Sequence, residues 1–470
     1  MIRPTRRVGQ QASLWLLFAL RIKKCFRLRY LLITLIILIL LTYLRLINHA
    51  PVDPSMLNDA SSDHRQQKSS LDKLRSLKCN FDEIESLLRY KSTRPPHTDS
   101  RPRPTIERLR KLFQMLISYE DKFRRVFDHL QIFRFTDMYN TLRPYANDTQ
   151  RLHNIYCLLQ RYTTISDNGH IDIESGFINY LSQVSSYLAD GFDNQHLSWN
   201  TTSTDAIRKP VIVLGSNIHF FNMLQASMRT IDKFLKDHNV AVYDLGFTAD
   251  QVDMITANCK RCTVIKFPFE EVASVASHVR NLANFAWKPI IIHDAVRRFG
   301  SIIYGDTSVR YNTSNFTRLL IDNEIRGFSC RELPGHYLPC FTLEKTFTWF
   351  NETPSTFDDV YIAEAGFVAV TDNFLSRLVL KTWVTCALDP ECIAPTQSKS
   401  VCKHRSGTGN VHRYDQSAMV AVLSFYFFPS SRNGSTSNPA PYDMYASIQG
   451  KLAEVRRGEG DPTYFTVHKP

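Results

Sequence analysis

An acidic side chain follows a predicted strand at a position where it can meet a ligand. Asp306 comes directly after an apolar strand predicted over 301–304. In open α/β sheets, ligands bind beyond the carboxyl ends of the strands, so Asp306 is the first candidate functional residue. A carboxylate there could hold Mn²⁺ or Mg²⁺, which take oxygen ligands and neutralise a diphosphate. The alternative is a structural turn, in which Asp306 caps Ser308 and Val309.

Two other predicted strands also end in polar residues. Ser216 and Asn217 end the first strand of the α/β region, and Asp244 ends the second. The right-handed crossover rule places these ends along one edge of the sheet together with Asp306. We therefore expect their side chains to surround one ligand site.

Lys288 stands just before a helix that is predicted to open at Pro289. An ammonium group at this place could contact a phosphate. A solvated lysine at the start of a helix is an equally good interpretation.

The segment His412-Arg413-Tyr414-Asp415-Gln416 places several hydrogen-bonding groups at the head of an apolar helix. An acid in the first turn offsets the helix dipole, so Asp415 has a purely structural explanation as well. The concentration of His412, Asp415 and Gln416 is harder to explain by capping alone. These three residues are therefore site candidates.

Glu364 lies inside an otherwise apolar strand predicted over 360–371. A buried acid must be paired or face a cavity. A catalytic role and a structural pairing with an Arg or Lys of the core are both open.

Several familiar enzyme motifs are absent from the sequence. There is no GxGxxG after the first strand, no GxxxxGK[ST], no GxSxG and no HExxH. The dinucleotide, P-loop, α/β-hydrolase and zincin classes therefore lose their usual support. The net charge of +12 falls to +4 once the eight Lys and Arg of residues 1–29 are subtracted, which argues against a nucleic-acid-binding surface.

Strands and helices alternate from residue 211 to residue 304, which predicts an α/β fold with a doubly wound, mostly parallel sheet. Apolar runs predict strands at 211–216, 240–245, 263–267 and 301–304. Helical spacing predicts helices at 217–238, 248–258 and 270–286, then from Pro289 to Gly300, and later near 315–325, 343–350, 374–386 and 412–427. Beyond Pro429 the sequence is polar and rich in Gly and Pro, and little structure is expected.

The region before the α/β domain predicts a membrane anchor and a stem. Residues 30–47 are apolar with one charge, Arg45, and eighteen helical residues span roughly 27 Å. A cleaved signal peptide is the alternative. The positive-inside rule then gives type II topology. We predict a basic cytoplasmic tail (1–29), a transmembrane helix (30–47), a flexible stem (48–104), a helical stem region (105–208), the α/β domain (209–428) and a C-terminal tail (429–470).

Cysteines and glycosylation motifs fit a compartment of the secretory pathway. Nine of the ten cysteines follow the predicted span, and the close sets Cys259/Cys262, Cys330/Cys340 and Cys386/Cys392/Cys402 suit disulfides. The alternative for Cys259 and Cys262 is a redox or zinc half-site. The spacing leaves the connectivity open. Six N-x-Ser/Thr motifs lie at Asn147, Asn200, Asn312, Asn315, Asn351 and Asn433.

Ordered blocks of the sequence resemble those of a known class of enzymes. The blocks are VIVLGSNIHFF, VYDLGFT, FAWKPIIIHDAV, YGDTSVR, EAGFVAVT with the following Trp383, and HRYDQSA. They are similar to blocks of an invertebrate family of type II membrane proteins. That family resembles GT-A fold nucleotide-sugar glycosyltransferases, especially the group of glycogenin and bacterial lipopolysaccharide galactosyltransferases. The resemblance covers about residues 209–428.

The resemblance implies roles for residues that bind the nucleotide and the sugar. Ser216 and Asn217 would border the nucleotide, together with Asp244. Gly366 matches a small residue in the strand on the acceptor side. Asp415 and Gln416 look like an Asp-Gln pair that contacts the transferred sugar.

The resemblance also implies a metal site, with one departure from the family pattern. Asp306 stands where such enzymes begin an Asp-x-Asp metal motif, but the second acid is Ser308 here. The loss of one carboxylate weakens metal coordination and puts activity in question. His412 is a candidate compensating ligand.

These observations predict a Golgi membrane glycosyltransferase with a lumenal α/β domain. It would move a sugar from a nucleotide-diphosphate donor to a glycan or protein acceptor, with Glu364, Asp415 and Gln416 as catalytic candidates. Charge stabilisation of the leaving diphosphate would come from Asp306 with a metal, or from Lys288. The stem could form a homodimer. The alternative is a catalytically silent lectin-like or partner-binding module, which Ser308 favours.

Overall fold

A computed structural model describes residues 79–80, 106–132, 134–135, 157, 161, 163–165, 171–174, 209–402, 411–427 and 452–467. These residues belong to one compact unit, Leu77–Pro470. The predicted cytoplasmic tail, transmembrane helix and nearly all of the flexible stem lie outside the described residues. Within the described ranges, no helix has the length and apolar character required to cross a membrane.

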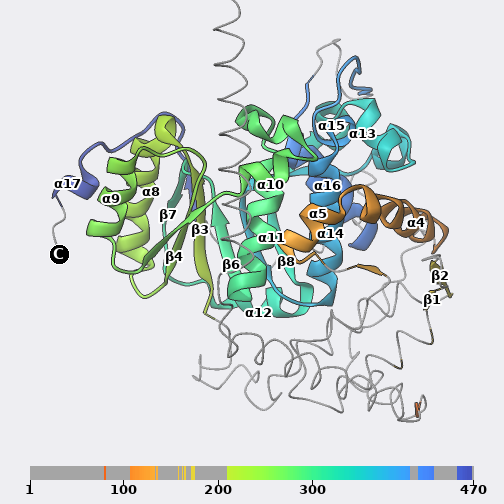
Figure 1. Cartoon of the computed structure of the whole chain (residues 1–470), viewed down its shortest axis with the longest axis horizontal. Helices are drawn as coiled ribbons and strands as arrows, with labels where there is room; N and C mark the ends of the chain where they lie inside the picture. Colours follow the sequence, from red (N-terminus) through yellow and green to blue (C-terminus); the bar gives the residue numbers. More distant parts are fainter. Residues whose placement is uncertain are drawn as a thin grey trace, which may run out of the picture. The chain divides into compact units, whose positions relative to one another are not determined.

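A six-stranded mixed sheet forms the centre of the α/β domain (Figure 1). The strand order is β5-β4-β3-β6-β9-β8. The neighbours from β5 to β6 pair in parallel, whereas β9 is antiparallel to both β6 and β8. The strands are β3 Val211–Ser216, β4 Val240–Asp244, β5 Cys262–Lys266, β6 Ser301–Gly305, β8 Phe328–Tyr337 and β9 Tyr361–Thr371. The predicted α/β class is confirmed, and the sheet is mixed.

Two helices, α8 (Phe221–Phe234) and α9 (Ala249–Asn258), lie together on one side of β3 and β4 (Figure 1). Leu224, Met228 and Ile231 form the apolar stripe of α8 and pack in the same core as Ile212 and Leu214 of β3. Their spacing follows the helical period, so they share one face of α8. A capping box of Thr248 and Gln251 starts α9.

The opposite face is covered by α11 (Trp287–Phe299), α14 (Phe374–Leu388) and α16 (Tyr414–Tyr426). Nearly every residue of α14 and α16 is buried, and apolar residues predominate in both helices. α11 begins at Trp287, two residues before the predicted start. Pro289 still falls in its first turn, where the missing N–H costs no helical hydrogen bond. Gly300, with a φ of 73°, ends the helix.

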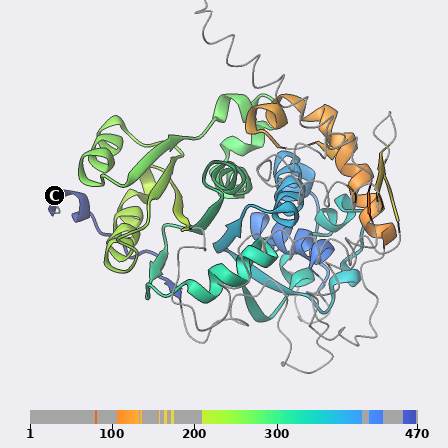
Figure 2. The same cartoon turned by 90° about the horizontal axis from the view of Figure 1, so that it is seen from below.

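The helices α4 (Ile106–Lys122) and α5 (Arg124–Leu130) pack against this second layer (Figure 2, orange). Their apolar residues recur with the predicted helical period, and Leu109, Phe113 and Leu116 are fully buried. Nζ of Lys381 in α14 lies 2.6 Å from Oε1 of Glu120 in α4. The Lys381 side chain is fully buried, so α4 supplies the counter-charge for the core of the α/β domain.

Three segments differ from the sequence prediction. The predicted helix 270–286 is instead a short helix, α10 (Phe269–Ala273), and two 3-10 turns, η4 (Ser277–Arg280) and η5 (Leu282–Asn284). The antiparallel strand β8 was not predicted. Beyond Pro429, where little structure was expected, β10 (Ala453–Val455) pairs with β7 (Val309–Tyr311), and α17 (Tyr464–Val467) packs on α8 and α9. A strand of three residues carries too short a pattern to be seen in the sequence.

The remaining elements are short apart from α12, and β1 and β2 form a separate two-stranded sheet beside α4. They are β1 Thr163–Ile165, β2 Ile171–Ile173, η3 Ile218–Phe220, α12 Thr317–Arg326, η6 Leu338–Phe341, α13 Glu344–Trp349, η7 Pro354–Phe357 and α15 Pro390–Ile393.

Disulfides are present, as the sequence predicted. They join Cys79 to Cys157, Cys259 to Cys262, Cys340 to Cys402, and Cys386 to Cys392. The Cys259–Cys262 bond replaces the alternative of a metal half-site. Cys340 bonds Cys402 rather than its nearer neighbour in the sequence, Cys330, which is buried.

Candidate active site at the end of the parallel strands

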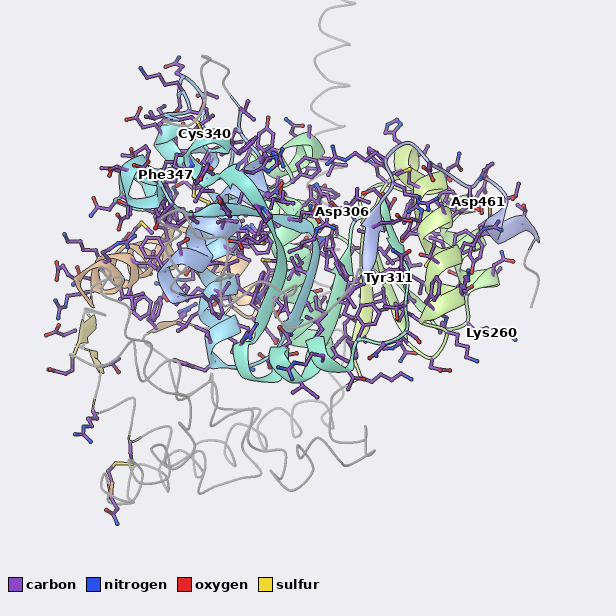
Figure 3. The ribbon with its side chains drawn as sticks, turned by 180° about the vertical axis from the view of Figure 1, so that it is seen from behind. Lys260, Asp306, Tyr311, Cys340, Phe347 and Asp461 are labelled. Carbon is purple, nitrogen blue, oxygen red and sulfur yellow. A yellow bond between two sulfur atoms is a disulfide. The ribbon has the colours of Figure 1, made fainter. Side chains whose placement is uncertain are left out.

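The ends of three parallel strands bring polar residues to one edge of the sheet. Ser216 at the end of β3 is in register with Asp244 at the end of β4, and Asp306 follows β6 on the other side of β3. The chain passes from β3 outward through β4 to β5 and then returns to β6, so the strand order reverses between β3 and β6. Open α/β sheets bind ligands at such a reversal. Figure 3 shows Asp306 at this end of the sheet.

Lys288, Asp306 and Asp415 form an ionic cluster at this edge. Nζ of Lys288 lies 3.1 Å from Oδ1 of Asp306 and 2.9 Å from Oδ2 of Asp415. The side chains of Lys288 and Asp415 are 3% and 6% exposed, whereas that of Asp306 is 33% exposed. The cluster therefore joins α11, the loop after β6 and α16, and Asp306 is the member that solvent reaches.

Burial and charge act in opposite directions on the members of this cluster. Burial lowers the pKa of Lys288, but the charges of Asp306 and Asp415 outweigh it and hold the pKa above its ordinary value. Burial raises the pKa of Asp415 by more than the ammonium of Lys288 lowers it. The ammonium therefore stays charged, and the buried carboxylate is a costly anion that gains from any further hydrogen-bond donor.

Asp306 is held in place from three directions. The hydroxyl of Tyr304 donates to its Oδ1 at 2.8 Å, and its own N–H donates to the carbonyl of Gly366 at 2.8 Å. A Cβ on Gly366 would lie 2.7 Å from Oδ2 of Asp306, so any other residue there would displace the Asp306 side chain. Burial and then the charge of Asp306 raise the pKa of Tyr304 well above its usual value, so the hydroxyl remains a donor.

Asp415 and Gln416 lie in the first turn of α16. The indole N–H of Trp383 donates to the carbonyl of Asp415 at 3.1 Å, which fixes this turn against α14. Gln416 is half-buried, and its carboxamide makes no hydrogen bond with any of the described residues. Its donor and acceptor are therefore available to a ligand beside the cluster.

Two aromatic residues flank the cluster and were not singled out as site residues in the sequence. The rings of Phe285 and Tyr414 are 6.3 Å apart, and Nζ of Lys288 lies 5.1 Å from the centre of the Phe285 ring. Both residues have a positive φ, 55° and 43°, which is costly for bulky side chains and often marks functional sites. Phe285 is 38% exposed. No sequence pattern predicts this backbone conformation.

The polar residues at the ends of β3 and β4 are partly engaged by the backbone. The side chain of Asn217 accepts hydrogen bonds from the N–H groups of His219 and Phe220. Oδ1 of Asp244 accepts from the N–H groups of Gly246 and Phe247, both at 2.7 Å. Ser216 is buried beside Asn217. These bonds hold the loops that follow β3 and β4.

Two candidates are engaged elsewhere. Glu364 forms an ion pair with Arg331 of β8, which is the structural alternative considered for this acid. The Nδ1 of His412 accepts from the N–H of Leu343, and its Nε2 donates to the carbonyl of Ile393. Burial lowers the pKa of His412 to about 4, so it is neutral, with both ring nitrogens occupied.

The residues of the site do not fit a divalent metal ion. Among the described residues, no three His, Cys, Asp or Glu side chains gather to hold a metal. Asp306 is already contacted by Lys288 and Tyr304, Ser308 offers no carboxylate, and His412 has no ring nitrogen left. A hard ion needs several oxygen ligands from the protein or its substrate.

No protein-family model and no curated protein matches the chain. Solved glycosyltransferase structures are similar to it in fold. The galactosyltransferase LgtC with donor and acceptor sugar analogues has a TM-score of 0.32 and 11% identity, over 53% of this chain and 88% of LgtC. The bifunctional glycosyltransferase WbbM has a TM-score of 0.30 and 9% identity, over 56% and 48%. Mouse xyloside xylosyltransferase 1 has a TM-score of 0.28 and 12% identity, over 45% and 81%.

Proposed function

We propose that the protein is a glycosyltransferase that moves a sugar from a nucleotide-diphosphate donor to a hydroxyl group of a glycan or protein. The observation that carries this proposal is the cluster of Lys288, Asp306 and Asp415 at the point where the strand order reverses. Buried charged groups at such a point fit a ligand that is itself charged and rich in hydroxyl groups.

The nucleotide would occupy the crevice beyond β3, β4 and β6. Ser216, Asn217 and Asp244 lie at these strand ends, and their hydroxyl, carboxamide and carboxylate groups suit a ribose and a base. The diphosphate would then lie toward Asp306, which is the exposed member of the ionic cluster.

The transferred sugar would lie over Asp415 and Gln416. The carboxylate of Asp415 accepts hydrogen bonds from sugar hydroxyls, and the free carboxamide of Gln416 both donates and accepts. Lys288 holds Asp415 in place. The flat rings of Phe285 and Tyr414 offer an apolar surface for the face of a sugar ring. Positioning of this kind is a major source of rate enhancement in group transfer.

In the reaction, the bond between the anomeric carbon and the diphosphate oxygen breaks, and its electron pair leaves with the diphosphate. The acceptor oxygen forms the new glycosidic bond with the anomeric carbon, and its proton passes to the leaving diphosphate or to solvent. The protein's contribution would be orientation of the sugar and stabilisation of the charge on the leaving diphosphate.

The proposed location is the Golgi membrane, with the α/β domain in the lumen and a single membrane span before it. Asn312, Asn315 and Asn351 are exposed, so these three glycosylation motifs are accessible to modification. Disulfides among the described cysteines suit an oxidising compartment.

Glu364 remains a catalytic candidate only if its pair with Arg331 opens. A homodimer through the stem remains a proposal.

A second candidate function is a lectin-like module without activity. Ser308 favours it, because the loss of the second acid removes a metal ligand that such enzymes would use. Incubation of purified residues 48–470 with a panel of nucleotide sugars, with and without Mn²⁺, distinguishes the transferase from the lectin-like module. Release of nucleoside diphosphate supports the transferase. Binding of glycans with no turnover and no thermal shift by any nucleotide supports the lectin-like module.

The variants Asp415→Asn and Gln416→Ala test the assigned sugar site. Asp253→Asn is the matched control, because Asp253 is an exposed acid on α9. Turnover should fall at least about a hundredfold in Asp415→Asn, as for the loss of a group that acts on the reacting sugar, and stay unchanged in the control. Equal turnover in all three proteins would remove Asp415 and Gln416 from the site.

A further inference from the structure

A short C-terminal segment, residues 456–461, lies against the loop that follows β6 and carries Asp306. The N–H of Arg456 donates to the carbonyl of Ser308 at 2.8 Å, and the N–H of Asp461 donates to the carbonyl of Asn222 in α8 at 2.8 Å. The segment therefore bridges the loop after β6 and the start of α8, which follows β3. In Figure 3 Asp306 and Asp461 both lie near the same end of the sheet.

Glycines let this segment lie close to α8. A Cβ on Gly460 would lie 2.9 Å from the Cβ of Asn222, and Gly458 has a φ of 78°. Residues 456–461, Arg-Arg-Gly-Glu-Gly-Asp, are thus a glycine-containing segment with two basic and two acidic side chains, bound to the loop after β6 and to the start of α8. We call it the C-terminal strap.

Arg310 connects the strap to the loop that carries Asp306. Its guanidinium donates to the carbonyls of Thr307 at 2.7 Å, Val309 at 3.0 Å and Glu459 of the strap at 2.5 Å. Arg310 is 6% exposed, yet no carboxylate of the described residues lies within ion-pair distance of it. A buried guanidinium stays charged and normally has an anionic partner, so the one here is electrostatically incomplete.

Arg310 is close to Asp306 along the chain and in space. The N–H of Val309 donates to the carbonyl of Asp306 at 2.8 Å, which closes a tight turn from Asp306 to Val309. Arg310 follows this turn directly and folds back on its carbonyl groups. Its charge therefore acts at the same loop as the position of the missing second acid, Ser308.

Arg457 adds a second cation on the strap. It is exposed and forms no ion pair with the described residues, whereas Arg456 pairs with Glu454 and Glu459. Cationic groups from two parts of the chain thus lie at the loop after β6: Lys288 of α11 contacts Asp306, and Arg310 contacts Thr307. The ligand that fits between them is an anion with several oxygens.

We propose that Arg310 and Arg457, rather than a divalent metal ion, neutralise the diphosphate of the donor nucleotide. This inference rests on the proposed transferase function and deepens it. It explains why the second acid of the metal motif can be Ser308: a cation already built into the loop makes a carboxylate for metal binding unnecessary. Arg310 would act through its charge, because it is buried and its Nη1 and Nη2 groups donate to three carbonyls, whereas the exposed Arg457 would bind phosphate oxygens directly. Both guanidinium groups remain charged at all working pH values.

Calorimetric titration of residues 48–470 with UDP, GDP, CDP and ADP tests this inference, first in EDTA and then with Mn²⁺. For the nucleotide that binds, the two dissociation constants should agree within about threefold. In parallel, the electron paramagnetic resonance signal of free Mn²⁺ should stay undiminished when protein is added without nucleotide. Binding that disappears in EDTA and returns with Mn²⁺ would overturn the inference while leaving the proposed transferase intact. Absence of nucleotide binding under both conditions would refute the transferase itself.

Substitutions test whether Arg310 and Arg457 are the cations that neutralise the diphosphate. Arg310→Met should weaken binding in EDTA at least tenfold, Arg310→Lys should recover part of the loss, and Arg457→Gln should weaken binding about threefold. Lys260→Gln is the matched control, because Lys260 is an exposed cation at the far end of the sheet from Asp306 (Figure 3). Thermal melting identifies any variant that fails to fold. If Arg310→Met does not fold, binding by Arg457→Gln decides the test, because Arg457 is exposed. Unchanged binding in folded Arg310→Met and Arg457→Gln would contradict the assignment.

Discussion

Nζ of Lys288 in α11 lies 2.9 Å from Oδ2 of Asp415 in α16, and both side chains are almost completely buried. Burying two charges is tolerable only when they are paired, because each alone would pay a desolvation cost of several kcal/mol. The pair therefore fixes two helices of one layer to each other at the edge where the candidate site lies. Lys288 also contacts a second acid, Asp306, which is the member of the cluster that solvent reaches.

Removing the ammonium should cost both stability and ligand binding. In Lys288→Met the carboxylate of Asp415 stays buried without its partner, so the free energy of unfolding should fall by roughly 3–5 kcal/mol. Urea denaturation followed by circular dichroism measures this loss. Lys233→Met, at an exposed site on α8, should change the unfolding free energy by less than about 0.5 kcal/mol. The double variant Lys288→Met/Asp415→Leu should recover stability but not turnover. Persistent destabilisation there would argue against the pairing explanation.

Acidification should destabilise the domain through two buried histidines. Burial lowers the pKa of both His293 and His412 from 6.5 to about 4. Because the folded-state pKa values are lower than the unfolded ones, the unfolded chain binds protons first. Stability is therefore complete above pH 6.5 and falls as the pH decreases toward 4, by roughly 3 kcal/mol for His293.

Unfolding midpoints measured from pH 7.5 to pH 4.5 test this dependence. His293→Gln keeps a donor for the carbonyl of Leu130, which the histidine Nε2 contacts at 3.1 Å, and has no proton to gain. Its stability should therefore vary less with pH than that of the unchanged protein. Parallel pH profiles for the two proteins would show that His293 does not titrate on unfolding.

The local elements of the domain could be predicted because their apolar residues repeat. The run Val211–Ser216 is apolar and ends in a polar loop, and Leu224, Met228 and Ile231 keep the helical period, so β3 and α8 follow from local pattern. The same holds for α14 and α16, which are rich in apolar residues. The strand β8 has no such pattern, because its second half is exposed and contains Pro334 and Gly335. The strand β10 has only three residues.

The candidate site was predictable as a set of residues but not as a contact network. Strand ends drew attention to Asp306 and Asp244, and the helix head drew attention to Asp415. Nothing in the sequence pairs Lys288 with Asp415, because the packing of α11 and α16 creates this contact between distant segments. The ion pair of Glu364 with Arg331 was similarly invisible, because it depends on the register between β8 and β9. The sequence could list the charged groups without assigning their partners.

Loss of the N-terminal helices should unfold the α/β domain, although the predicted domain begins at residue 209. Lys381 is fully buried and pairs with Glu120 of α4, and His293 contacts the carbonyl of Leu130 at the end of α5. A chain that begins at residue 209 leaves this ammonium without its partner and exposes the surface that Phe113 covers. Expression and thermal melting should show a folded protein for residues 77–470 and aggregation for 209–470. A cooperative melt of equal midpoint for 209–470 would show that the two helices are dispensable.

Glu120→Gln tests the charge of Glu120 separately from the apolar contacts of α4. The amide keeps the shape of the side chain but leaves the Lys381 ammonium buried without a counter-ion, so the free energy of unfolding should fall by roughly 3 kcal/mol. Glu107→Gln, on the exposed face of α4, should have little effect. Burial already lowers the pKa of Lys381 to about 8, so the loss in Glu120→Gln should be smaller at pH 9, where the amine is neutral, than at pH 6. A loss that is the same at both pH values would mean that packing, rather than charge, holds α4 to α14.

Gly366→Ala should damage the site while leaving the fold in place. The new methyl group would lie 2.7 Å from Oδ2 of Asp306, closer than a real contact allows, and Asp306 is a side chain at the edge of the sheet that can move away. Its displacement breaks the hydrogen bond from Tyr304 and separates it from Lys288, so turnover should fall at least about tenfold, with a loss of unfolding free energy of only about 1–2 kcal/mol. Asp306→Asn provides the comparison, because it keeps the shape and removes the charge. If the methyl acts by moving Asp306, the double variant Gly366→Ala/Asp306→Asn should be no worse than the more damaging single variant. Multiplied losses in the double variant would instead mean that Gly366 contacts the substrate independently of Asp306.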